Sequence, residues 1–454
     1  MTGKVSIPGG GFELLDASGS TTISGRFRGA GGNGALVLRV DGDRLTGEFD
    51  LGGQAGVIDA RRTEADAQTF FRPPEQRLDI ATDQWLGDLD ALVRILKSEH
   101  GAPFRRVSTD QFDREVARTR SAIPRLSGIE VALEFRRLGA LIGDGHTSVD
   151  LPNGLPRFPL EFYVFDDGVR VVSTAPEFSQ LMGAKLTAIN DVPVSGVIAR
   201  LRAFVAAGET DWFYRSTMPD LVIRPNVLRA AGIGEGPAFS FTFETDQGQN
   251  RENLTATEVL GRVIQDAGKP LWRRNVEKDF WSERLNDGSV YVNWRSYDDL
   301  TDHAKALLHD MNTKRPNRLI VDLRDNDGGD YNAGRKLIDE IRHRPWLNKR
   351  GVLYVLIGRK TFSAAMTNAI DFKTLTEATL IGEPAGAAPN NWQEVRRFNL
   401  PNSGLRVGVS TRYYAFLPGA PELRPDHLVP PVLSDWGADV DSAVRFVVER
   451  PMPH

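Results

Sequence analysis

The pattern of hydrophobic and polar positions changes three times along the chain, and each stretch predicts a different kind of domain. Residues 1–70 alternate between apolar and polar positions and are rich in glycine. Asp41-Gly42 stands between two alternating runs, which is a strong signal for a β-hairpin. We therefore expect a small antiparallel β module over residues 1–72. It would serve either as a docking or regulatory appendage or as a stability cap.

After residue 74 the apolar period becomes helical. The first helix has one apolar stripe at spacings of three and four residues, formed by Leu86, Leu89, Val93 and Leu96. Ser108–Gln111 and Ser127–Glu130 each fit a capping box ahead of a periodic apolar run. The pattern predicts a helical bundle within residues 76–150. Its last helix is expected to end at Gly143, so that His146 lies in the loop that follows this helix.

A second alternating stretch begins at Phe158 and predicts a β-rich domain over residues 152–260, with Phe239–Phe243 as the strand that closes it. Within it, Gly183–Val194 reads G-x-x-L-x-x-I-N-x-x-P-V. This stretch resembles peptide-binding PDZ modules, which bind peptides by adding a strand at an exposed sheet edge. An ordinary β-rich domain with a tight turn is the alternative, because the pattern is degenerate.

From residue 290 onward, short apolar strands alternate with helical stretches. Strands are expected at 290–294, 319–323, 352–357 and 378–381, and helices near 301–313, 332–342 and 363–375. This alternation predicts an α/β unit with a mainly parallel sheet over residues 270–454. In such sheets the carboxyl ends of the strands hold the chemistry.

Ser363 lies where one of these strands turns into a helix. The strand ends at Ile357, the sequence G-R-K-T-F-S-A-A follows, and small and apolar residues then continue as a helix. Free amides and the positive dipole end of a helix stabilise an oxyanion, so this place suits a nucleophile. The alternative is that Ser363 only caps the helix, since serine is a favoured N-cap.

The preceding strand runs into the glycine pair Gly328-Gly329, and adjacent glycines let backbone amides approach a ligand closely. A G-E-P-A-G turn follows at residues 382–386. The ordered motifs DLRxNxGG, G-R-x-T-F-S-A and G-E-x-x-G resemble those of the tail-specific (C-terminal processing) serine peptidase family. The match covers residues 285–454 and extends more weakly back to residue 76. The resemblance implies a crotonase-like (Clp-like) spiral of ββα units in the core and a PDZ-like domain before it.

Members of this family divide by the base that activates the serine. The lysine of one group corresponds to Ala388 here, and no lysine follows Lys373. Lys373 itself lies roughly 15 Å along the helix from Ser363, at 1.5 Å per residue. The resemblance therefore implies the histidine-glutamate type, which is related to the tricorn core.

His146, in the sequence D-G-H-T, matches the base of the histidine-using relatives. A histidine that only caps the helix end is the alternative reading, and His427 is the runner-up base. His100 is expected at a polar helix end, away from the site. An unperturbed histidine base predicts that turnover falls on acidification through roughly pH 6–7.

The resemblance also implies a glutamate some sixty residues after the serine, and Glu422 stands 59 residues after Ser363. Its carboxylate would orient the imidazole of His146. A solvated loop glutamate is the alternative for Glu422, and Glu383 is the alternative acid. The oxyanion hole is expected to combine the amide of Ala364 with an amide of Gly328 or Gly329.

The composition excludes several other classes of function. Apolar residues make up 41% and charged residues 26% of the 454 residues, as in globular proteins, and the net charge of −4 shows no basic excess for nucleic acid. The chain has no cysteine, no zinc-type histidine cluster and no phosphate-binding or dinucleotide fingerprint, so no metal or cofactor is expected. It shows neither a signal peptide nor an apolar stretch of ~18 residues. The chain as written is therefore expected in the cytoplasm, although an exported protein with its signal removed would look the same.

These observations together predict a serine endopeptidase that cleaves peptides or polypeptides near their C-termini through an acyl-enzyme. The sequence leaves open its cleavage preference and its oligomeric state, a homo-oligomer included. A non-catalytic peptide- or ligand-binding protein on the same fold is one alternative. An esterase or peptide cyclase that uses the same serine is the other.

Overall fold

The computed structural model describes strand segments between residues 4 and 61, and then residues 76–152, 154–257, 265–266, 268–437 and 441–452. These residues form two units, Met1–Glu75 and Gln76–His454, which are described separately. In the described ranges, no helix is long and apolar enough to cross a membrane.

The first unit is an antiparallel meander in which each strand pairs with the next one along the chain. Its strands are β1 (Lys4–Val5), β2 (Phe12–Ser18), β3 (Thr22–Gly29), β4 (Gly32–Asp41), β5 (Arg44–Leu51) and β6 (Gln54–Arg61). Asp41 of β4 pairs with Arg44 of β5, while Gly42 of the hairpin expected at Asp41-Gly42 lies outside the described residues.

The second unit opens with the expected helical bundle. Its helices are α2 (Thr82–Glu99), α3 (Thr109–Ala122), the 3-10 helix η1 (Ile123–Arg125) and α4 (Gly128–Ile142). The Ser108 hydroxyl accepts a hydrogen bond from the Gln111 amide, and the Glu130 carboxylate accepts one from the Ser127 amide. Helix α4 ends at Gly143, whose φ of 90° is a left-handed conformation that glycine adopts easily.

A β-rich domain follows the bundle. Its strands are β8 (Leu160–Phe165), β9 (Gly168–Thr174), β10 (Lys185–Ile189), β11 (Val192–Pro193), β12 (Ala238–Thr245), β13 (Gly248–Thr255) and β14 (Gln265–Asp266). Its helices are η2 (Pro176–Leu181), α5 (Val194–Leu201), η3 (Arg202–Phe204), α6 (Asp211–Val222) and α7 (Pro225–Ala230).

The expectation that Phe239–Phe243 closes this domain is wrong. It lies in β12, which pairs along its whole length with β13, and β14 then pairs with β9. Strand β13 reads G-Q-N-R-E-N-L-T and is largely exposed at the sheet edge. Because it buries almost no side chain, it lacks the apolar signal that marks the other strands.

The last part of the chain forms a six-stranded sheet in the order β15-β16-β17-β18-β19-β22. The strands are β15 (Phe280–Arg284), β16 (Val290–Trp294), β17 (Leu319–Asp322), β18 (Leu353–Ile357), β19 (Thr379–Gly382) and β22 (His427–Leu428). Every neighbouring pair is parallel except β15 and β16. The mixed α/β fold with a mainly parallel sheet is therefore confirmed.

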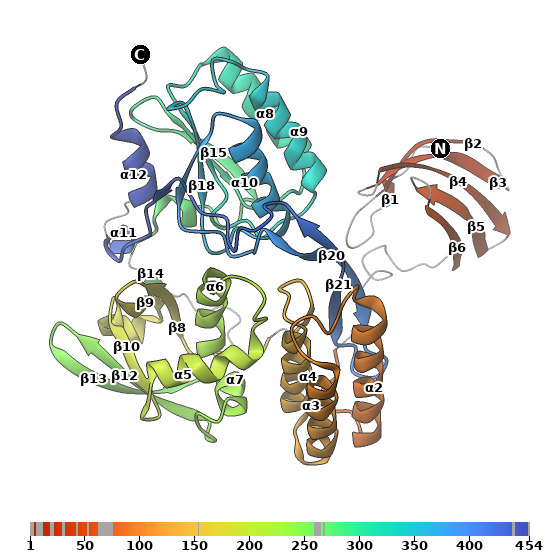
Figure 1. Cartoon of the computed structure of the whole chain (residues 1–454), viewed down its shortest axis with the longest axis vertical. Helices are drawn as coiled ribbons and strands as arrows, with labels where there is room; N and C mark the ends of the chain where they lie inside the picture. Colours follow the sequence, from red (N-terminus) through yellow and green to blue (C-terminus); the bar gives the residue numbers. More distant parts are fainter. Residues whose placement is uncertain are drawn as a thin grey trace. The chain divides into compact units, whose positions relative to one another are not determined.

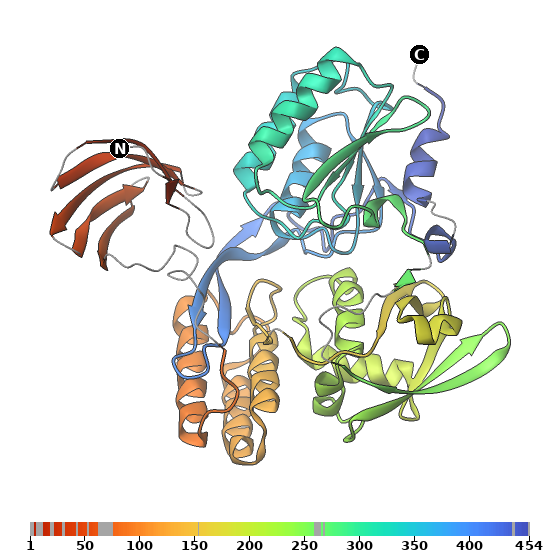
Figure 2. The ribbon, with the colours of Figure 1, turned by 180° about the vertical axis from the view of Figure 1, so that it is seen from behind.

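Helices cover both faces of this sheet (Figures 1 and 2). Helices α8 (Leu300–Thr313), α9 (Tyr331–Arg342) and α10 (Ser363–Leu375) share one core with Val321 and Val355. Helix α12 (Ser442–Val448) packs on the other face against Ile320 and Leu356. Successive strand residues thus enter opposite cores, as the two-residue period of a strand requires. The short helices η4 (Leu271–Arg273) and α11 (Ser434–Gly437) complete this part.

A long hairpin connects the sheet domain to the helical bundle. Strands β20 (Asn390–Asn399) and β21 (Arg406–Ala415) form a separate sheet with β7 (Ser148–Val149), which follows the bundle. Val407 pairs with Val149 and is buried in the core of the bundle. This pairing fixes the turn that carries His146 beside the α/β sheet.

Candidate active site

Ser363 is the first residue of α10, and the N-cap of that helix is Phe362. The interpretation of Ser363 as the helix cap is therefore wrong. Ser363 has a φ of 48°, in the left-handed region that non-glycine residues rarely occupy. Such strain persists only where the surroundings enforce it, and it concentrates at functional sites.

Hydrogen bonds from two strand ends hold this turn. The Thr361 hydroxyl donates to the Leu323 carbonyl (2.8 Å) and accepts from the Gly358 amide (2.9 Å). The Phe362 amide donates to the Asn326 carbonyl (3.0 Å). The loop after β17 therefore fixes the backbone immediately before Ser363.

The glycine pair lies directly against Ser363. A Cβ atom placed on Gly328 would be 2.6 Å from Ser363 Cβ and 3.1 Å from its Oγ. The Gly328 amide donates to Asn326 Oδ1 (2.9 Å), so that amide already has an acceptor. In the described chain the amides of Gly329 and Ala364 have no hydrogen-bond acceptor. The Ala364 amide nitrogen would lie 3.0 Å from the same Cβ position on Gly328, so an unpaired N–H group lies beside the glycine pair.

His146 lies next to the nucleophile turn. Its ring packs on Phe362 at a centroid distance of 4.6 Å, and Phe362 also stacks on Phe213 of α6 at 5.1 Å. Both ring nitrogens are buried, and neither has a hydrogen-bond partner among the described residues. Burial lowers the pKa of His146 to about 4, although the charge of Asp144 opposes that shift. The fall in turnover through roughly pH 6–7 that an unperturbed histidine predicts is therefore not expected from His146 in this structure.

Asp144 and His100 support the turn that carries His146. Asp144 Oδ1 accepts the His146 amide (3.1 Å) and the Ser410 hydroxyl (2.7 Å), and Asp144 Oδ2 accepts His100 Nε2 (3.0 Å). His100 Nδ1 accepts the Ala102 amide, so Nε2 carries the proton. Burial acts to raise the pKa of Asp144, but the hydrogen bonds from His100 and Ser410 hold it below its usual range.

His100 lies at the end of α2, as expected, but the expectation that it stays away from the site is wrong, because its side chain is buried against Asp144. No local signal in the sequence marks this role, since Asp144 lies 44 residues away. His427, the runner-up base, contacts Arg450 through both ring nitrogens (3.3 and 3.5 Å) and packs on Phe446. It therefore belongs to the contact between β22 and α12.

The two candidate acids have different surroundings. Glu422 forms an ion pair with Arg424 and lines an open cavity of about 710 Å³ together with Glu209. Glu383 is buried and forms an ion pair with Arg359, which also donates to the Val164 carbonyl of β8 (2.7 Å). No hydrogen bond joins either acid to His146 in the described chain.

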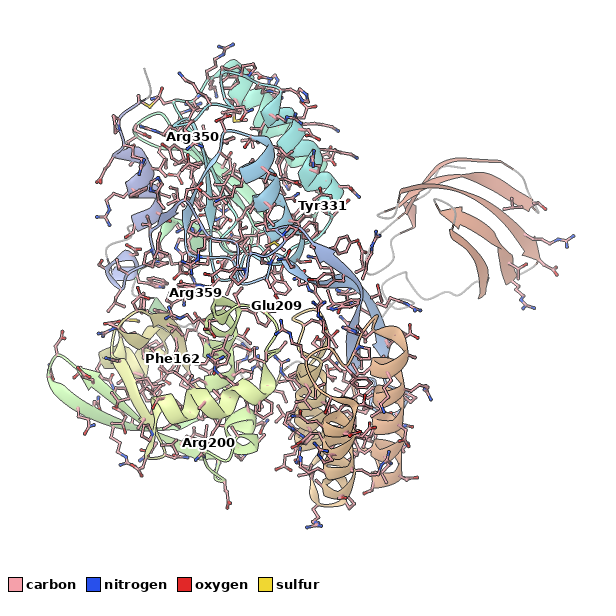
Figure 3. All side chains as sticks on the ribbon, viewed as in Figure 1. Phe162, Arg200, Glu209, Tyr331, Arg350 and Arg359 are labelled. Atoms are coloured by element: carbon pink, nitrogen blue, oxygen red, sulfur yellow. The ribbon has the colours of Figure 1, made fainter. Side chains whose placement is uncertain are left out.

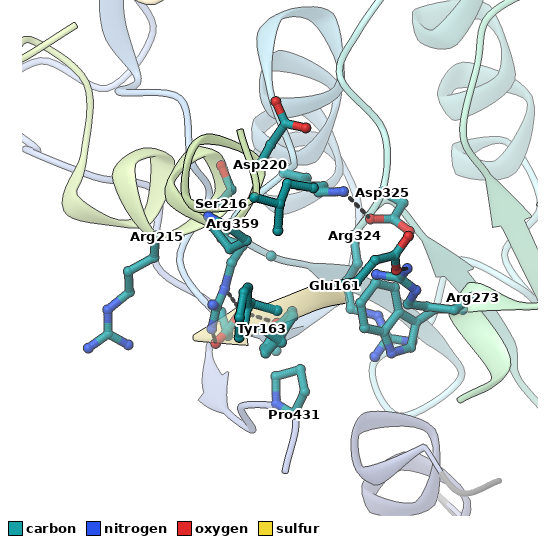
Figure 4. A pocket seen from close by; sticks show the side chains of 18 of the residues that line it. Glu161, Tyr163, Arg215, Ser216, Asp220, Arg273, Arg324, Asp325, Arg359 and Pro431 are labelled. Carbon is teal, nitrogen blue, oxygen red and sulfur yellow. Dashed lines mark hydrogen bonds and ion pairs between the residues drawn. The ribbon is translucent and has the colours of Figure 1, made fainter. Parts of the chain in front are cut away.

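A second cavity, of about 200 Å³, lies between the β-rich domain and the carboxyl ends of β17, β18 and β19 (Figure 4). Its walls come from β8 and α6 on one side and from the loops after these strands on the other. Its lining has four acidic residues, Glu161, Asp220, Asp325 and Glu383, and six basic ones, Arg157, Arg215, Arg273, Arg324, Arg359 and Lys360. Each of these basic side chains forms an ion pair with a carboxylate of the chain. Figure 3 shows Arg359 and Glu209 where the β-rich domain faces the α/β core.

The chain is similar to one peptidase family and to several solved structures. A model of peptidase family S41 matches residues 289–421, which include Ser363, the glycine pair and the β20–β21 hairpin. The structure of mature CPAF is 12% identical with a TM-score of 0.54, over 81% of this chain and 96% of that chain. At this identity the likeness shows a shared fold.

Two further solved structures match less closely. The photosystem II D1 C-terminal processing protease is 14% identical with a TM-score of 0.38, over 79% of this chain and 98% of that chain. The tricorn protease is 11% identical with a TM-score of 0.38, over 98% of this chain and 46% of that chain. No curated protein matches the sequence.

The close approach of Gly328 to Ser363 predicts the effect of adding one methyl group. Gly328→Ala should lower kcat/KM by about 10²-fold or more, because its Cβ would displace the serine hydroxyl and the neighbouring amides. Gly248→Ala is the matched control, since Gly248 has the same φ of 111° but no atom within 4 Å of its added Cβ. Peptide hydrolysis measured for both variants checks this, and equal activities would contradict it.

The buried ion pair between Glu383 and Arg359 predicts that removing Glu383 lowers the free energy of unfolding more than removing an exposed acid does. Glu383→Ala leaves Arg359 buried without its partner, which should lower the free energy of unfolding by about 3–5 kcal/mol. Asp211→Ala removes an exposed pair with Arg202 and should cost about 0–1 kcal/mol. Urea denaturation measures both values. A small effect for Glu383→Ala would show that this ion pair does not stabilise the turn at residues 382–386.

Proposed function

We propose, from the premise that this chain belongs to peptidase family S41, that it is a serine endopeptidase of the histidine-glutamate type acting near polypeptide C-termini. The family identifies the chain as a serine-type peptidase. The observation that carries the proposal is Ser363 in a strained backbone conformation, with the unpaired Ala364 amide next to it and Gly328 packed against its side chain. A serine in a binding protein would need neither feature.

In the proposed reaction, Ser363 Oγ attacks the scissile carbonyl carbon while His146 accepts the hydroxyl proton. The amides of Gly329 and Ala364 donate to the oxygen of the tetrahedral intermediate, and Gly328 leaves the space for it. His146 then gives the proton to the leaving amine, and an acyl-enzyme remains. A water molecule that loses its proton to His146 releases the acid product and restores the serine.

His146 and Ser363 share Phe362 as a neighbour but form no hydrogen bond with each other in this structure. Catalytic hydrogen bonds are often formed only once substrate is bound. We therefore propose that the hydrogen bond between His146 and Ser363 forms when substrate binds, through a rotation of these side chains. Glu422 is the acid we assign to orient the imidazole, because its partner Arg424 is exposed, whereas Glu383 is buried in an ion pair with Arg359.

The finer features of the fold belong to the same proposal. The mainly parallel sheet of residues 270–454, with helices on both faces, supports a crotonase-like core, and the sheet of β8 to β14 with α6 beside β8 supports a PDZ-like domain. The basic cavity lies between these two parts. Arginine side chains bind carboxylates well, so we propose that this cavity holds the C-terminal carboxylate of a polypeptide substrate.

The nucleophile assignment predicts which side chains a fluorophosphonate probe requires. Ser363→Ala should abolish labelling and peptide cleavage and should change the melting temperature little. His146→Ala should slow labelling strongly, because it removes the base, whereas His427→Ala should not. Peptide mass mapping of the labelled protein checks the site. Full cleavage activity in Ser363→Ala would overturn the mechanism.

The role proposed for the basic cavity predicts a difference between long and short substrates. Ser216 lines the cavity from α6, so Ser216→Trp should fill it (Figure 4). Cleavage of a long polypeptide should fall several-fold, because the tether raises the local substrate concentration, while cleavage of a short chromogenic peptide should change little. Ser121→Trp on exposed α3 is the control. Equal losses for both substrates would show that the cavity is structural.

A further inference from the structure

Glu209 lies in the loop before α6 and joins two loops that the chain folds together from distant positions. Its Oε1 accepts the Gly145 amide (3.0 Å), and its Oε2 accepts the Ala388 amide (2.7 Å). Gly145 immediately precedes His146, and Ala388 lies between β19 and β20. Each carboxylate oxygen therefore holds the backbone of one loop.

The Ala388 loop is also attached to the nucleophile turn. The Ala387 amide donates to the Thr361 carbonyl (3.4 Å), two residues before Ser363. Thr210, next to Glu209, donates its hydroxyl to the Ala385 and Gly386 carbonyls (3.1 and 2.7 Å). A continuous series of hydrogen bonds thus runs from the His146 turn through Glu209 to the Ser363 turn.

The fit around Glu209 is tight on the side of His146. A Cβ atom on Gly145 would lie 2.8 Å from Glu209 Cγ and 2.8 Å from Phe362 Cζ. Asn391 lines the same small cavity as Glu209, and its buried Nδ2 has no hydrogen-bond partner in the part of the chain described. A further donor for the Glu209 carboxylate is therefore already in place.

We propose that Glu209 is a positioning residue of this active site, which holds the His146 turn at the distance from Ser363 that proton transfer needs. This inference rests on the proposed function of Ser363 and His146. Both amides are donors, so the carboxylate is suited to the position because it offers two acceptor oxygens. Glutamine offers one acceptor and places an N–H group against the other amide. Aspartate is one methylene shorter and reaches only one of the two loops.

The charge on Glu209 makes this role dependent on pH. Burial raises the pKa of Glu209 to about 7, and the nearby Asp144 adds to the shift, while the two backbone amides oppose it. Above that pKa the anion accepts both amides, and below it the added proton faces one of them. Activity should therefore fall as the pH drops through about 7. The charged and titratable groups that share its two cavities are His100, Arg105, Arg106, Asp144, Arg202, Asp211, Tyr214, Arg215, Tyr413, Glu422 and Arg424.

The test compares Glu209→Gln and Glu209→Asp with Glu235→Gln, an exposed glutamate of the same domain. Both Glu209 variants should lower kcat by about 10- to 100-fold with KM changed less than about threefold, because misplacing the base slows chemistry more than binding. The profile of kcat/KM against pH for Glu209→Gln should lose the acid limb near pH 7. Glu235→Gln should match the wild type in every respect.

Two results would overturn the inference. One is wild-type kcat in both Glu209 variants, and the other is a lower kcat with the limb near pH 7 unchanged, which would indicate a merely structural role. If Glu209→Gln does not fold, Glu209→Asp still tests the loss of kcat at unchanged melting temperature. Failure of the proposed function is distinguishable, because it would appear as fluorophosphonate labelling that does not depend on Ser363.

Discussion

The pairing of β7 with β21 is the constraint on which the site depends. Only Ser148 and Val149 take part from the bundle side, yet they pair with Gly408 and Val407 more than 250 residues further along the chain. The Thr147 and Ser410 hydroxyls add a hydrogen bond of 3.0 Å beside this pairing. Because these contacts directly follow His146, the bundle holds this proposed base in place only when the β20–β21 hairpin has formed.

Buried ion pairs at the carboxyl ends of the parallel strands also hold separate parts of the chain together. Arg324, after β17, pairs with Asp322 and with Asp441 at the start of α12. Arg359, after β18, pairs with Glu383 and reaches β8. Buried pairs of this kind add little net stability compared with apolar packing, but they leave few other ways to dock the parts. They hold neighbouring parts of the chain to the edge of the sheet where Ser363 lies.

Much of this arrangement follows from local sequence. The four strands and three helices expected between residues 290 and 381 fall within a residue or two of their bounds, because each has a strong apolar period and clear ends. Strands β15, β20, β21 and β22 and helix α12 were not predicted. The turn at Ser363 was predictable from the strand and helix on either side of it. Its positive φ was not, since this depends on hydrogen bonds to Asn326 and Leu323 from another strand end.

The supporting residues of the site could not be predicted in the same way. His100 and Glu209 lie in polar stretches without a motif, and their partners are Asp144, Gly145 and Ala388. The low pKa of His146 likewise comes from burial against Phe362, which no local pattern encodes. Long-range contacts decide these roles, and a single sequence does not display such contacts.

The strained turn at Ser363 also affects when the chain can become reactive. Its backbone conformation costs on the order of 1–3 kcal/mol and is held by groups from two other strand ends. A nascent or partly unfolded chain lacks those groups, so its serine relaxes to an ordinary, unreactive side chain. The conformation of the proposed nucleophile is therefore complete only in the finished core, and an unfinished chain does not yet carry the proposed site.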